Sequence, residues 1–449
     1  MLKNEYVRRV YETVEKRNAG EVDFPQAVYQ VLESLEPLVE QHPEYEAAGL
    51  LERFVEPERV IIFSVPWTDD EGKVHVNRGF RVQFNSAIGP YKGGLRFHPT
   101  VDVSDLKALA FEQTLKNSLT TLPMGGGKGG SDFDPHGRSD AEVMRFCQSF
   151  MNELYRHIGP HTDIPAGDIG VGAREVGYLY GQYKRITGRF DSAVITGKGI
   201  PFGGSLTRTE ATGYGLCYFV REYLRCVRND SFEGKRVIVS GSGNVALHAA
   251  EKATQLGGTV IAMSDSAGYV YDPAGINIPL LKDIKLKRRA RITVYADEVP
   301  TAEYHAGARD IWGLQADICL PCSIQNEINA DDAKKIISNG TIGVFEGANL
   351  PCTPEARALI LEAGLLYSPG KASNAGGVAV SGLEMSQNSL RLSWTAEEVD
   401  ERLQTIMAGI FHSAWDAAEA VGAKGNLMTG ANAAAFMKVA AAMLAQGAV

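Results

Sequence analysis

The sequence has few cysteines for its length and only one close pair of them. Six cysteines in 449 residues are too few for a scaffold held by disulfides, and Cys319 and Cys322 form the one close pair. Because no second pair lies nearby and no histidine stands at a suitable spacing, we expect no zinc or other metal site. These absences favour a reduced protein, and we expect a cytoplasmic one.

The sequence also lacks an excess of positive charge and a long apolar run. Lysine and arginine number 45 against 54 acidic residues, a formal net charge of -9. A general nucleic-acid surface is therefore not expected. We find no apolar run long enough to span a bilayer, and residues 1–18 carry charges throughout, unlike a signal peptide. We expect neither nucleic acid nor a membrane as a partner.

What is present indicates two or three domains of an α/β protein. The first half mixes amphipathic helices with a β-hairpin, and from Arg236 strands alternate with helices. In the first half we predict helices over residues 2–14, 25–39, 104–117, 139–154 and 174–186, and hairpin strands over 59–65 and 74–84. Ser139 and Glu142 form a capping box for one helix, and Thr395 and Glu398 form another.

A glycine-rich stretch around Lys128 is the first candidate site. Residues 123–132, PMGGGKGGSD, read as a loop whose glycines would let a ligand approach the backbone and the ammonium closely. A Walker phosphate loop is excluded, because it needs glycine where Leu122 stands and serine or threonine where Gly129 stands. A structural turn with a solvated lysine is the alternative.

Two further lysines strengthen the case for a site. Lys92 follows the hairpin, and Gln113 and Lys116 lie three residues apart on one face of a predicted helix. If these lysines meet Lys128 in one cleft, each lowers the pKa of the others, and one becomes able to act as a base. A small dicarboxylate is the natural ligand of such a cluster.

Asp168 supplies a candidate acid. It lies in the segment 161–170, which we predict to be a loop ahead of a helix, and it would serve as a proton shuttle. The alternative is a helix N-cap, which is more frequent for an isolated aspartate.

The second half carries a dinucleotide-binding pattern. The predicted strand 236–240 leads into Gly241-Ser-Gly-Asn-Val-Ala246, and a helix follows to about Gln255. This is the G-x-G-x-x-A arrangement in its required context, and the pyrophosphate would bind the N–H groups at the helix start. Further strands are predicted at 259–263, 292–295, 317–320, 342–346 and 365–367, making a parallel sheet of about six strands.

The residues themselves leave the choice of cofactor open. Asp265 follows the second strand, where an acid often binds the ribose hydroxyls of NAD. Against this, Ser264 and Ser266 flank it, and the basic residues 282–289 would neutralise the phosphate of NADP unless they are a solvated helix face. Farther on, Ser381 lies beyond a turn of small residues at 370–380, where it would bind an anion or cap a helix.

Taken together, these motifs resemble one family. They are residues 91–100 (YKGGLRFHPT), 111–120 (FEQTLKNSLT), 123–133, 163–168 (DIPAGD), 241–246 (GSGNVA) and 374–377 (NAGG). From about Arg59 to the C-terminus the chain resembles the hexameric glutamate dehydrogenases of bacteria and lower eukaryotes.

The resemblance implies an N-terminal α/β substrate domain with a mostly parallel or mixed sheet, a Rossmann-like dinucleotide domain, and a cleft between them. It implies a substrate-binding and oligomerisation domain over 1–203, with the C-terminal helix 425–449 packing back on it, and a cofactor domain over 204–424. It also implies a homohexamer that interconverts L-glutamate with 2-oxoglutarate and ammonium, in the direction of ammonium assimilation.

The resemblance further assigns roles to residues. Lys92 and Ser381 would hold the side-chain carboxylate, and Gln113, Lys116 and the backbone of Gly167 the α-carboxylate. Lys128 would be the catalytic lysine and Asp168 its acid/base partner. The implied cofactor contacts are Thr212, Gly241, Ser242, Gly243, Asn244, Val245, Ser264, Asp265, Lys287, Asn349 and Asn374. The serines around Asp265 are similar to those of the branch that prefers NADP over NAD.

Two rival functions remain. A dehydrogenase of another amino acid would keep the lysine, aspartate and dinucleotide elements but have an apolar side-chain pocket, which Lys92 and Ser381 argue against. The second rival is a protein that binds and senses a dinucleotide but catalyses no reaction with it.

Overall fold

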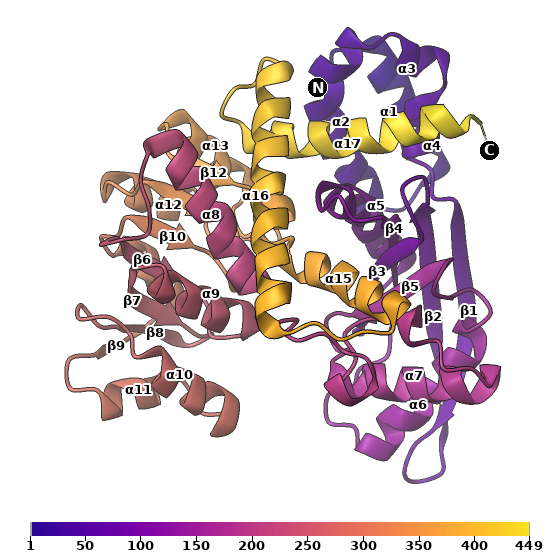
Figure 1. Cartoon of the computed structure of the whole chain (residues 1–449), viewed down its shortest axis with the longest axis horizontal. Coiled ribbons are helices and arrows are strands. Elements are labelled where there is room, and N and C mark those ends of the chain that lie inside the picture. Colours follow the sequence, from indigo (N-terminus) through magenta and orange to yellow (C-terminus); the bar gives the residue numbers. More distant parts are fainter. Residues whose placement is uncertain (1, 449) are drawn as a thin grey trace. The chain divides into compact units, whose positions relative to one another are not determined.

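The computed structural model describes residues 2–448, which divide into two compact units (Figure 1). The first unit contains the chain up to Arg208, together with Val380–Val399 and the residues from Asn432 onward. The second contains Thr209–Ala379 and Asp400–Ala431. Each unit therefore includes segments that are far apart in the sequence.

The first unit is built on a mixed five-stranded sheet in the order β1-β2-β4-β3-β5. Its strands are β1 (Arg59–Thr68), β2 (Val74–Asn85), β3 (Tyr91–Phe97), β4 (Gly126–Ser131) and β5 (Asp163–Gly167). The first two form the predicted antiparallel hairpin, and β3 lies parallel to both β4 and β5. Its helices are α1 (Glu5–Arg17), α2 (Asp23–Gln41), α3 (Glu44–Ala47), α4 (Leu50–Phe54), α5 (Val103–Leu119), α6 (Asp140–Leu154) and α7 (Ala173–Thr187), and its 3₁₀ turns are η1 (Ser192–Val194) and η2 (Ile200–Phe202).

The prediction of loops over 123–132 and 161–170 is wrong for their central residues, which form β4 and β5. The glycines of β4 and of the neighbouring strand β3 allow close packing inside the protein. A Cβ atom at Gly126 would lie 1.8 Å from the Thr114 Oγ1 atom of α5, and one at Gly93 would lie 1.6 Å from the carbonyl oxygen of Gly127. A strand made almost wholly of glycine has no alternating apolar pattern, so the sequence did not reveal it.

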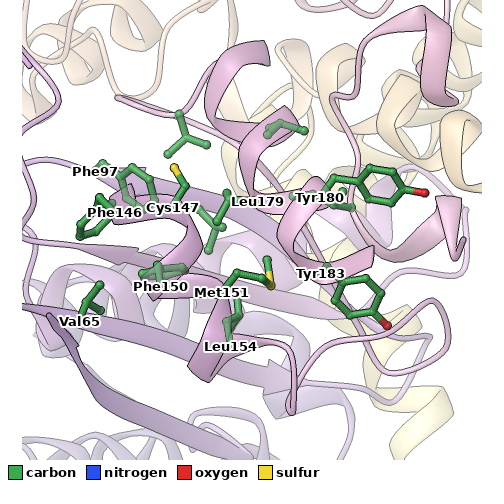
Figure 2. Close-up of a cluster of buried hydrophobic side chains, with 14 of the residues drawn as sticks. Val65, Phe97, Phe146, Cys147, Phe150, Met151, Leu154, Leu179, Tyr180 and Tyr183 are labelled. Carbon is green, nitrogen blue, oxygen red and sulfur yellow. The ribbon is translucent and has the colours of Figure 1, made fainter. Parts of the chain in front are cut away.

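Helices α6 and α7 cover a large apolar core (Figure 2). Val65 and Phe97 come from the sheet, Phe146 and Phe150 from α6, and Leu179 from α7. The aromatic rings of Phe97 and Phe146 meet edge to face at 5.1 Å. This burial holds the sheet rigid behind the strands that carry the candidate site.

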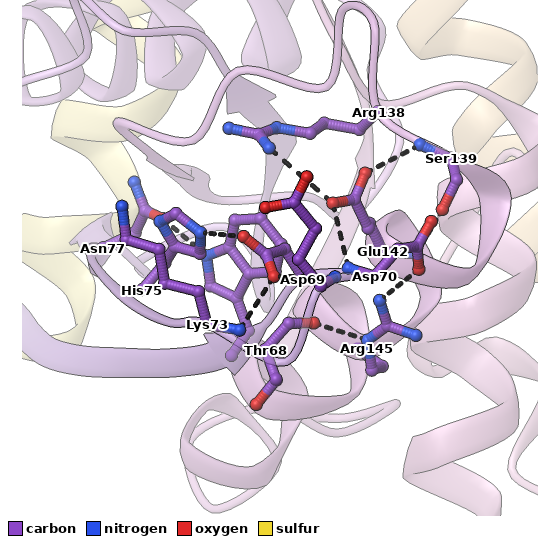
Figure 3. Close-up of polar contacts among 12 residues, drawn as sticks. Thr68, Asp69, Asp70, Lys73, His75, Asn77, Arg138, Ser139, Glu142 and Arg145 are labelled. Carbon is purple, nitrogen blue, oxygen red and sulfur yellow. Dashed lines mark hydrogen bonds and ion pairs between the residues drawn. The ribbon is translucent and has the colours of Figure 1, made fainter.

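The tip of the hairpin is attached to the start of α6 (Figure 3). Arg145 on α6 donates to the Asp70 carboxylate at 2.6 Å and to the Thr68 carbonyl oxygen at 2.5 Å. The capping box of Ser139 and Glu142 is confirmed. Because backbone groups at the hairpin tip and at the helix start are bound in one network, the tip of the long hairpin is fixed to α6.

The second unit contains a seven-stranded sheet in the order β12-β11-β10-β6-β7-β8-β9. Its strands are β6 (Arg236–Val239), β7 (Thr259–Ser264), β8 (Gly268–Tyr271), β9 (Glu303–Ala306), β10 (Ile318–Leu320), β11 (Gly343–Phe345) and β12 (Leu366–Ser368). The five strands from β12 to β7 are parallel, as predicted for a Rossmann-like domain, whereas β8 pairs antiparallel with both β7 and β9. The predicted α/β class is confirmed.

The predicted strand at 292–295 is wrong. These residues enter helix α11 (Thr293–Glu298), and Ile292 and Tyr295 are both fully buried. Their spacing of three places them on the same side of a helical turn, and the Tyr295 hydroxyl accepts a hydrogen bond from the Asn277 N–H at 2.7 Å. The β-branched run favoured a strand locally, but packing and this hydrogen bond favour the helix.

The remaining helices lie between Ala211 and Gln446. They are α8 (Ala211–Arg228), α9 (Asn244–Gln255), α10 (Ile278–Lys282), the π-helix η3 (Asp283–Lys287), η4 (Ala308–Gly313), α12 (Ala330–Ser338), α13 (Pro354–Glu362) and α14 (Gly370–Ser373). Helices α15 (Gly376–Leu390), α16 (Ala396–Ala420) and α17 (Leu427–Gln446) follow, and the capping box of Thr395 and Glu398 opens α16.

Helix α17 meets the length and composition of a membrane span, contrary to the expectation from sequence. An 18-residue stretch of it has a mean hydropathy of 1.4, but 56% of that stretch is buried inside the protein. Phe436 packs edge to face against Tyr45 and Phe54 of the N-terminal helices. We therefore interpret α17 as a core helix.

Candidate active site

Strands β3, β4 and β5 and helix α5 carry the predicted substrate residues of the first unit. Lys92 lies on β3, Lys116 on α5 and Lys128 on β4, and Asp168 directly follows β5. Strand β3 pairs in parallel with both β4 and β5, which places the strands that carry Lys92 and Lys128 side by side and the end of β5, before Asp168, next to β3.

Lys128 and Asp168 form an ion pair, with the Lys128 ammonium 3.0 Å from the Asp168 carboxylate. The Arg96 guanidinium donates to the same oxygen at 2.9 Å. Burial opposes ionisation of Asp168, but the positive charges of Lys128 and Arg96 outweigh it and lower its pKa below the ordinary value. The carboxylate is thus held ionised beside the ammonium rather than acting as a helix cap, since Gly172 occupies the N-cap position of α7.

Asp163, the other aspartate of this motif, is engaged elsewhere. It forms a fully buried ion pair with Arg81, which also donates to the carbonyl oxygen of Gly93 at 3.1 Å. This pair joins β2, β3 and β5. Asp168 is therefore the carboxylate of the motif that faces the lysines.

Lys116 has the lowered pKa that the clustering of lysines predicted. Burial and then the positive charge of Lys128 lower the pKa of Lys116 to about 8. On the same helix, the Gln113 side chain donates to Asn117 Oδ1 at 2.6 Å. The amide of Asn117 in turn donates to the carbonyl oxygens of Lys92 and Gly125, which connects α5 to the start of both strands.

Lys92 has a different set of neighbours. Only 1% of it is exposed, and its ammonium donates to Thr196 Oγ1 at 2.8 Å. Burial lowers its pKa well below the ordinary value, and the charges of Arg208 and Arg81 lower it further. From the sequence we predicted that the charges of Lys116 and Lys128 would lower this pKa, but the charges that lower it are those of the two arginines.

Ser381 is buried in the interior of α15 and belongs to the surroundings of Lys92. Its hydroxyl accepts a hydrogen bond from the Arg208 guanidinium at 3.0 Å. Arg208 is itself a charge that acts on Lys92. Lys92, Arg208 and Ser381 thus form a cationic cluster suited to a carboxylate.

Sequence reasoning missed Arg96, Arg208 and Thr196. Arg96 lies within the motif 91–100, four residues after Lys92. A second cation in this motif could have indicated a further residue of the site. Arg208 and Thr196 stand in stretches without a recognisable pattern, and only folding brings them to Lys92.

In the second unit the glycine-rich turn has the geometry of a dinucleotide site. Gly241 adopts a φ of +85°, and its N–H donates to the hydroxyl of Ser264 at 2.8 Å. Gly243 is the N-cap of α9, which has no side-chain cap. The N–H groups of Asn244 and Val245 lie in its first turn, where they and the helix dipole favour a phosphate group.

The remaining predicted cofactor residues lie around this turn or along the same sheet edge. Ser242 is in the turn itself, and Thr212 is in the first turn of α8. The Asn244 side chain donates to the carbonyl oxygen of Thr209 at 2.6 Å, and the Asn374 side chain donates to Asn349 Oδ1 at 2.9 Å. These residues fit a nicotinamide dinucleotide.

The environment of Asp265 bears on which dinucleotide is bound. Its side chain is only 6% exposed and accepts hydrogen bonds from the N–H groups of Ala267 and Ile292. The Lys285 ammonium and the Arg291 guanidinium lie 3.9 and 3.8 Å from it. Burial opposes ionisation of Asp265, but these hydrogen bonds and Lys285 lower its pKa below the ordinary value. The negative charge of Asp265 is therefore buried and is balanced by these hydrogen bonds and by the nearby cations.

Basic residues near Asp265 divide into two kinds. Arg291 donates to the Ser266 hydroxyl at 2.6 Å beside the end of β7. Lys287, in contrast, is 81% exposed and pairs with Asp283 on its own helical segment. Arg291 and Lys285, rather than Lys287, therefore lie beside Asp265 and Ser266, and the sequence analysis did not name Arg291.

One group of possible metal ligands occurs among residues 2–448. Ligand atoms of Glu222, Cys226 and His412 lie within 4.8 Å of one another. The two oxygens of Glu222 already accept from Arg225 at 2.6 and 3.0 Å, and His412 lies 2.7 Å from one of them. We interpret the group as an ion-pair network between α8 and α16.

Comparison with known proteins decides the family. A family model described as Glutamate/Leucine/Phenylalanine/Valine dehydrogenase matches residues 203–447, and another, Glu/Leu/Phe/Val dehydrogenase, dimerisation domain, matches residues 57–185. The chain belongs to this dehydrogenase family. The expected oxidoreductase class is thereby confirmed.

Relatives within this dehydrogenase family cover almost the whole chain. The NADP-specific glutamate dehydrogenase of Salmonella typhimurium is 56% identical over 97% of each chain. The NAD-specific glutamate dehydrogenase of Clostridium symbiosum is 54% identical over 99% of each. A solved structure titled glutamate dehydrogenase, 54% identical, has a TM-score of 0.96 over 99% of this chain and 100% of that one. The resemblance to the bacterial-type glutamate dehydrogenases is confirmed.

Proposed function

We propose that this protein catalyses the reversible oxidative deamination of L-glutamate to 2-oxoglutarate and ammonium with NADP(H), and works chiefly toward glutamate. The observation that carries this is the pairing of a cationic cluster, Lys92 with Arg208 and Ser381, with the Lys128–Asp168 ion pair in one unit. Two carboxylates need two cationic sites, and a proton-transfer pair must serve the carbon between them.

In this proposal the two ends of the substrate bind separately. Lys92 and Ser381, joined by Arg208, hold the side-chain carboxylate. Lys116, Gln113 and the backbone of Gly167 hold the α-carboxylate. Since Lys92 projects from the sheet, Ser381 from α15 and Lys116 from α5, the α-carbon is held between the two clusters in one orientation.

Asp168 then transfers protons, and Lys128 stabilises the negative charge that develops on oxygen. In the direction of deamination, Asp168 takes a proton from the substrate amine, and Lys128 orients water and stabilises the oxygen that becomes the carbonyl oxygen. Ammonium leaves with the proton that Asp168 returns. The nicotinamide dinucleotide, when bound, accepts the hydride from the α-carbon or supplies it in reverse.

The direct test is turnover followed by absorbance. We expect purified protein to oxidise NADPH when 2-oxoglutarate and ammonium are both present, and to do so much more slowly when either is omitted. Binding of NADPH without its oxidation would support the rival, a dinucleotide-sensing protein.

Replacing Lys92 tests the substrate. We expect Lys92→Leu to lower kcat/KM for glutamate by at least about a hundredfold and to raise it for norleucine, because the pocket loses a buried cation and gains an apolar side chain. Steady-state rates with both amino acids measure this. An unchanged preference for glutamate would remove Lys92 from the side-chain pocket and favour the apolar rival.

NADP is proposed as the preferred cofactor over NAD because the charge of Asp265 is buried and balanced, whereas Arg291 and Ser266 lie beside it. Arg291→Ser is expected to lower kcat/KM for NADP by about tenfold or more while NAD use changes little, since one phosphate contact is lost. Lys287→Ser is the control and should leave both unchanged. Equal rates with NADP and NAD in the unaltered protein would contradict the preference.

The assembly and location remain proposals. The match to a dimerisation domain supports self-association, which we propose to be a homohexamer. All six cysteines are free thiols, as a reducing compartment would keep them, so we propose a cytoplasmic location. Fractionation of cells with an antibody to this protein tests the location.

A further inference from the structure

A buried ion pair lies behind Lys92 and has no role in the reaction proposed above. The Lys198 ammonium and the Glu384 carboxylate are 2.6 Å apart, and both side chains are 0% exposed. Glu384 lies one helical turn beyond Ser381 on α15. Taking two charges out of water is unfavourable unless their geometry serves some purpose, so the pair calls for an explanation.

The pair holds the segment 195–198 against α15 through several hydrogen bonds. The Lys198 ammonium donates to Glu384, to the carbonyl oxygen of Ile195 at 2.5 Å and to Asn388 Oδ1 at 2.9 Å, which uses all three of its N–H groups. The second Glu384 oxygen accepts from the N–H of Gly197 at 2.9 Å. The ion pair therefore clamps a four-residue turn onto α15.

The turn places a single side chain against Lys92. Gly197 has a φ of +84°, which a residue with a side chain rarely adopts, and the Thr196 N–H donates to the carbonyl oxygen of Pro165 on β5 at 3.0 Å. Thr196 is thus fixed on both sides, by the clamp and by the sheet. Its hydroxyl accepts the hydrogen bond from the Lys92 ammonium at 2.8 Å.

Glu384 also acts on the charges of the pocket itself. It is the carboxylate whose negative charge most opposes the lowering of the Lys92 pKa, and it does the same for Arg208. Neither Glu384 nor Lys198 is expected to touch the substrate. Both act through the turn and through charge.

We propose that Glu384 and Lys198 are positioning residues that, through the turn 195–198 and Thr196, aim the Lys92 ammonium at the substrate's side-chain carboxylate. This inference rests on the proposed function, in which Lys92 binds that carboxylate. It makes selectivity for a dicarboxylic amino acid depend on a pair of residues behind the pocket.

The test compares dicarboxylate binding with turnover. We expect Glu384→Gln to raise the KM for glutamate and the inhibition constant of glutarate by about tenfold or more, because the clamp loses its charge, while kcat falls less than threefold and the KM for NADP is unchanged. A merely structural role would reduce the active fraction, and thus kcat, without changing the glutarate constant. Glu419→Gln, which removes an exposed ion-pair partner of Lys424, is the matched control.

A second pair of variants decides the matter even if Glu384→Gln does not fold. Thr196→Val removes the hydroxyl that Lys92 uses, with little change in volume, and should reproduce the rise in the glutarate constant. Thr196→Ser keeps the hydroxyl, and its inhibition constant for glutarate should equal that of the unaltered protein. A glutarate constant that stays within twofold in Thr196→Val would overturn the inference.

Lys92→Leu separates this inference from the proposed function. If Lys92→Leu weakens glutarate binding but Glu384→Gln and Thr196→Val do not, the positioning role fails and the function stands. If Lys92→Leu also leaves glutarate binding unchanged, the assignment of the pocket fails.

Discussion

At the scale of single residues, the candidate site depends on where buried charge is balanced and where it is not. Asp168 and Asp265 are both held ionised by nearby cations and hydrogen bonds. Lys116, in contrast, has a positive neighbour in Lys128, and burial adds to its effect. A site with such an excess of positive charge favours the binding of an anion.

Lys116 should therefore control the alkaline side of the pH profile. Its ammonium binds the α-carboxylate only when protonated, which holds below its pKa of about 8. We expect kcat/KM for glutamate to fall as the pH rises above about 8, because this parameter reports groups of the free enzyme.

The matched variant is Lys116→Arg, which stays protonated throughout the accessible range. Its alkaline fall should begin at least about one pH unit higher, even if its rate at the optimum is lower. A fall at the same pH in both proteins would assign the ionisation to another group.

At the scale of elements, the glycines of β3 and β4 explain why the site is rigid. Side chains are missing where α5 and the neighbouring strands approach most closely, so backbone lies against backbone. Lys92 and Lys128 consequently project from strands rather than from a mobile loop, which limits the entropy lost on binding.

The packing of these strands can be tested without touching a charged residue. Gly93→Ala should lower the free energy of unfolding by at least about 2 kcal/mol, because its Cβ would lie 1.6 Å from the Gly127 carbonyl oxygen. Denaturation by urea measures this. Gly181→Ala is the control, since nothing lies within 4 Å of the added atom in α7, and it should stabilise the protein by up to about 1 kcal/mol. Equal effects of the two would contradict the packing argument.

At the scale of the whole molecule, the five-stranded sheet has an edge that favours association. Strand β1 pairs only with β2 in this sheet, and Val60 and Ile62 on it are 39% and 54% exposed. Exposed apolar edge strands are normally covered, and the dimerisation-domain match includes this strand.

We accordingly expect sedimentation to give a mass six times that of the 48.6 kDa chain. Ile62→Lys, which places a charge on the edge strand, should shift the distribution to smaller species. Ile324→Lys, at an exposed apolar residue of the second unit, should not. A monomer at micromolar concentration would contradict both the hexamer and the role of the edge.

The sequence alone determined the features that depend on short stretches of chain. The amphipathic helices, the hairpin, both capping boxes and the strand-turn-helix around Gly241 follow from local periodicity and turn chemistry, and the motifs around Lys92, Lys128 and Asp168 indicated the family. Only the tertiary structure decided that the glycine-rich stretches are strands, that 292–295 is helical, and that Arg96, Arg208 and Thr196 join the site. All three findings depend on packing or on charges that folding brings together from distant positions in the chain. The local sequence pattern contains little information about such contacts.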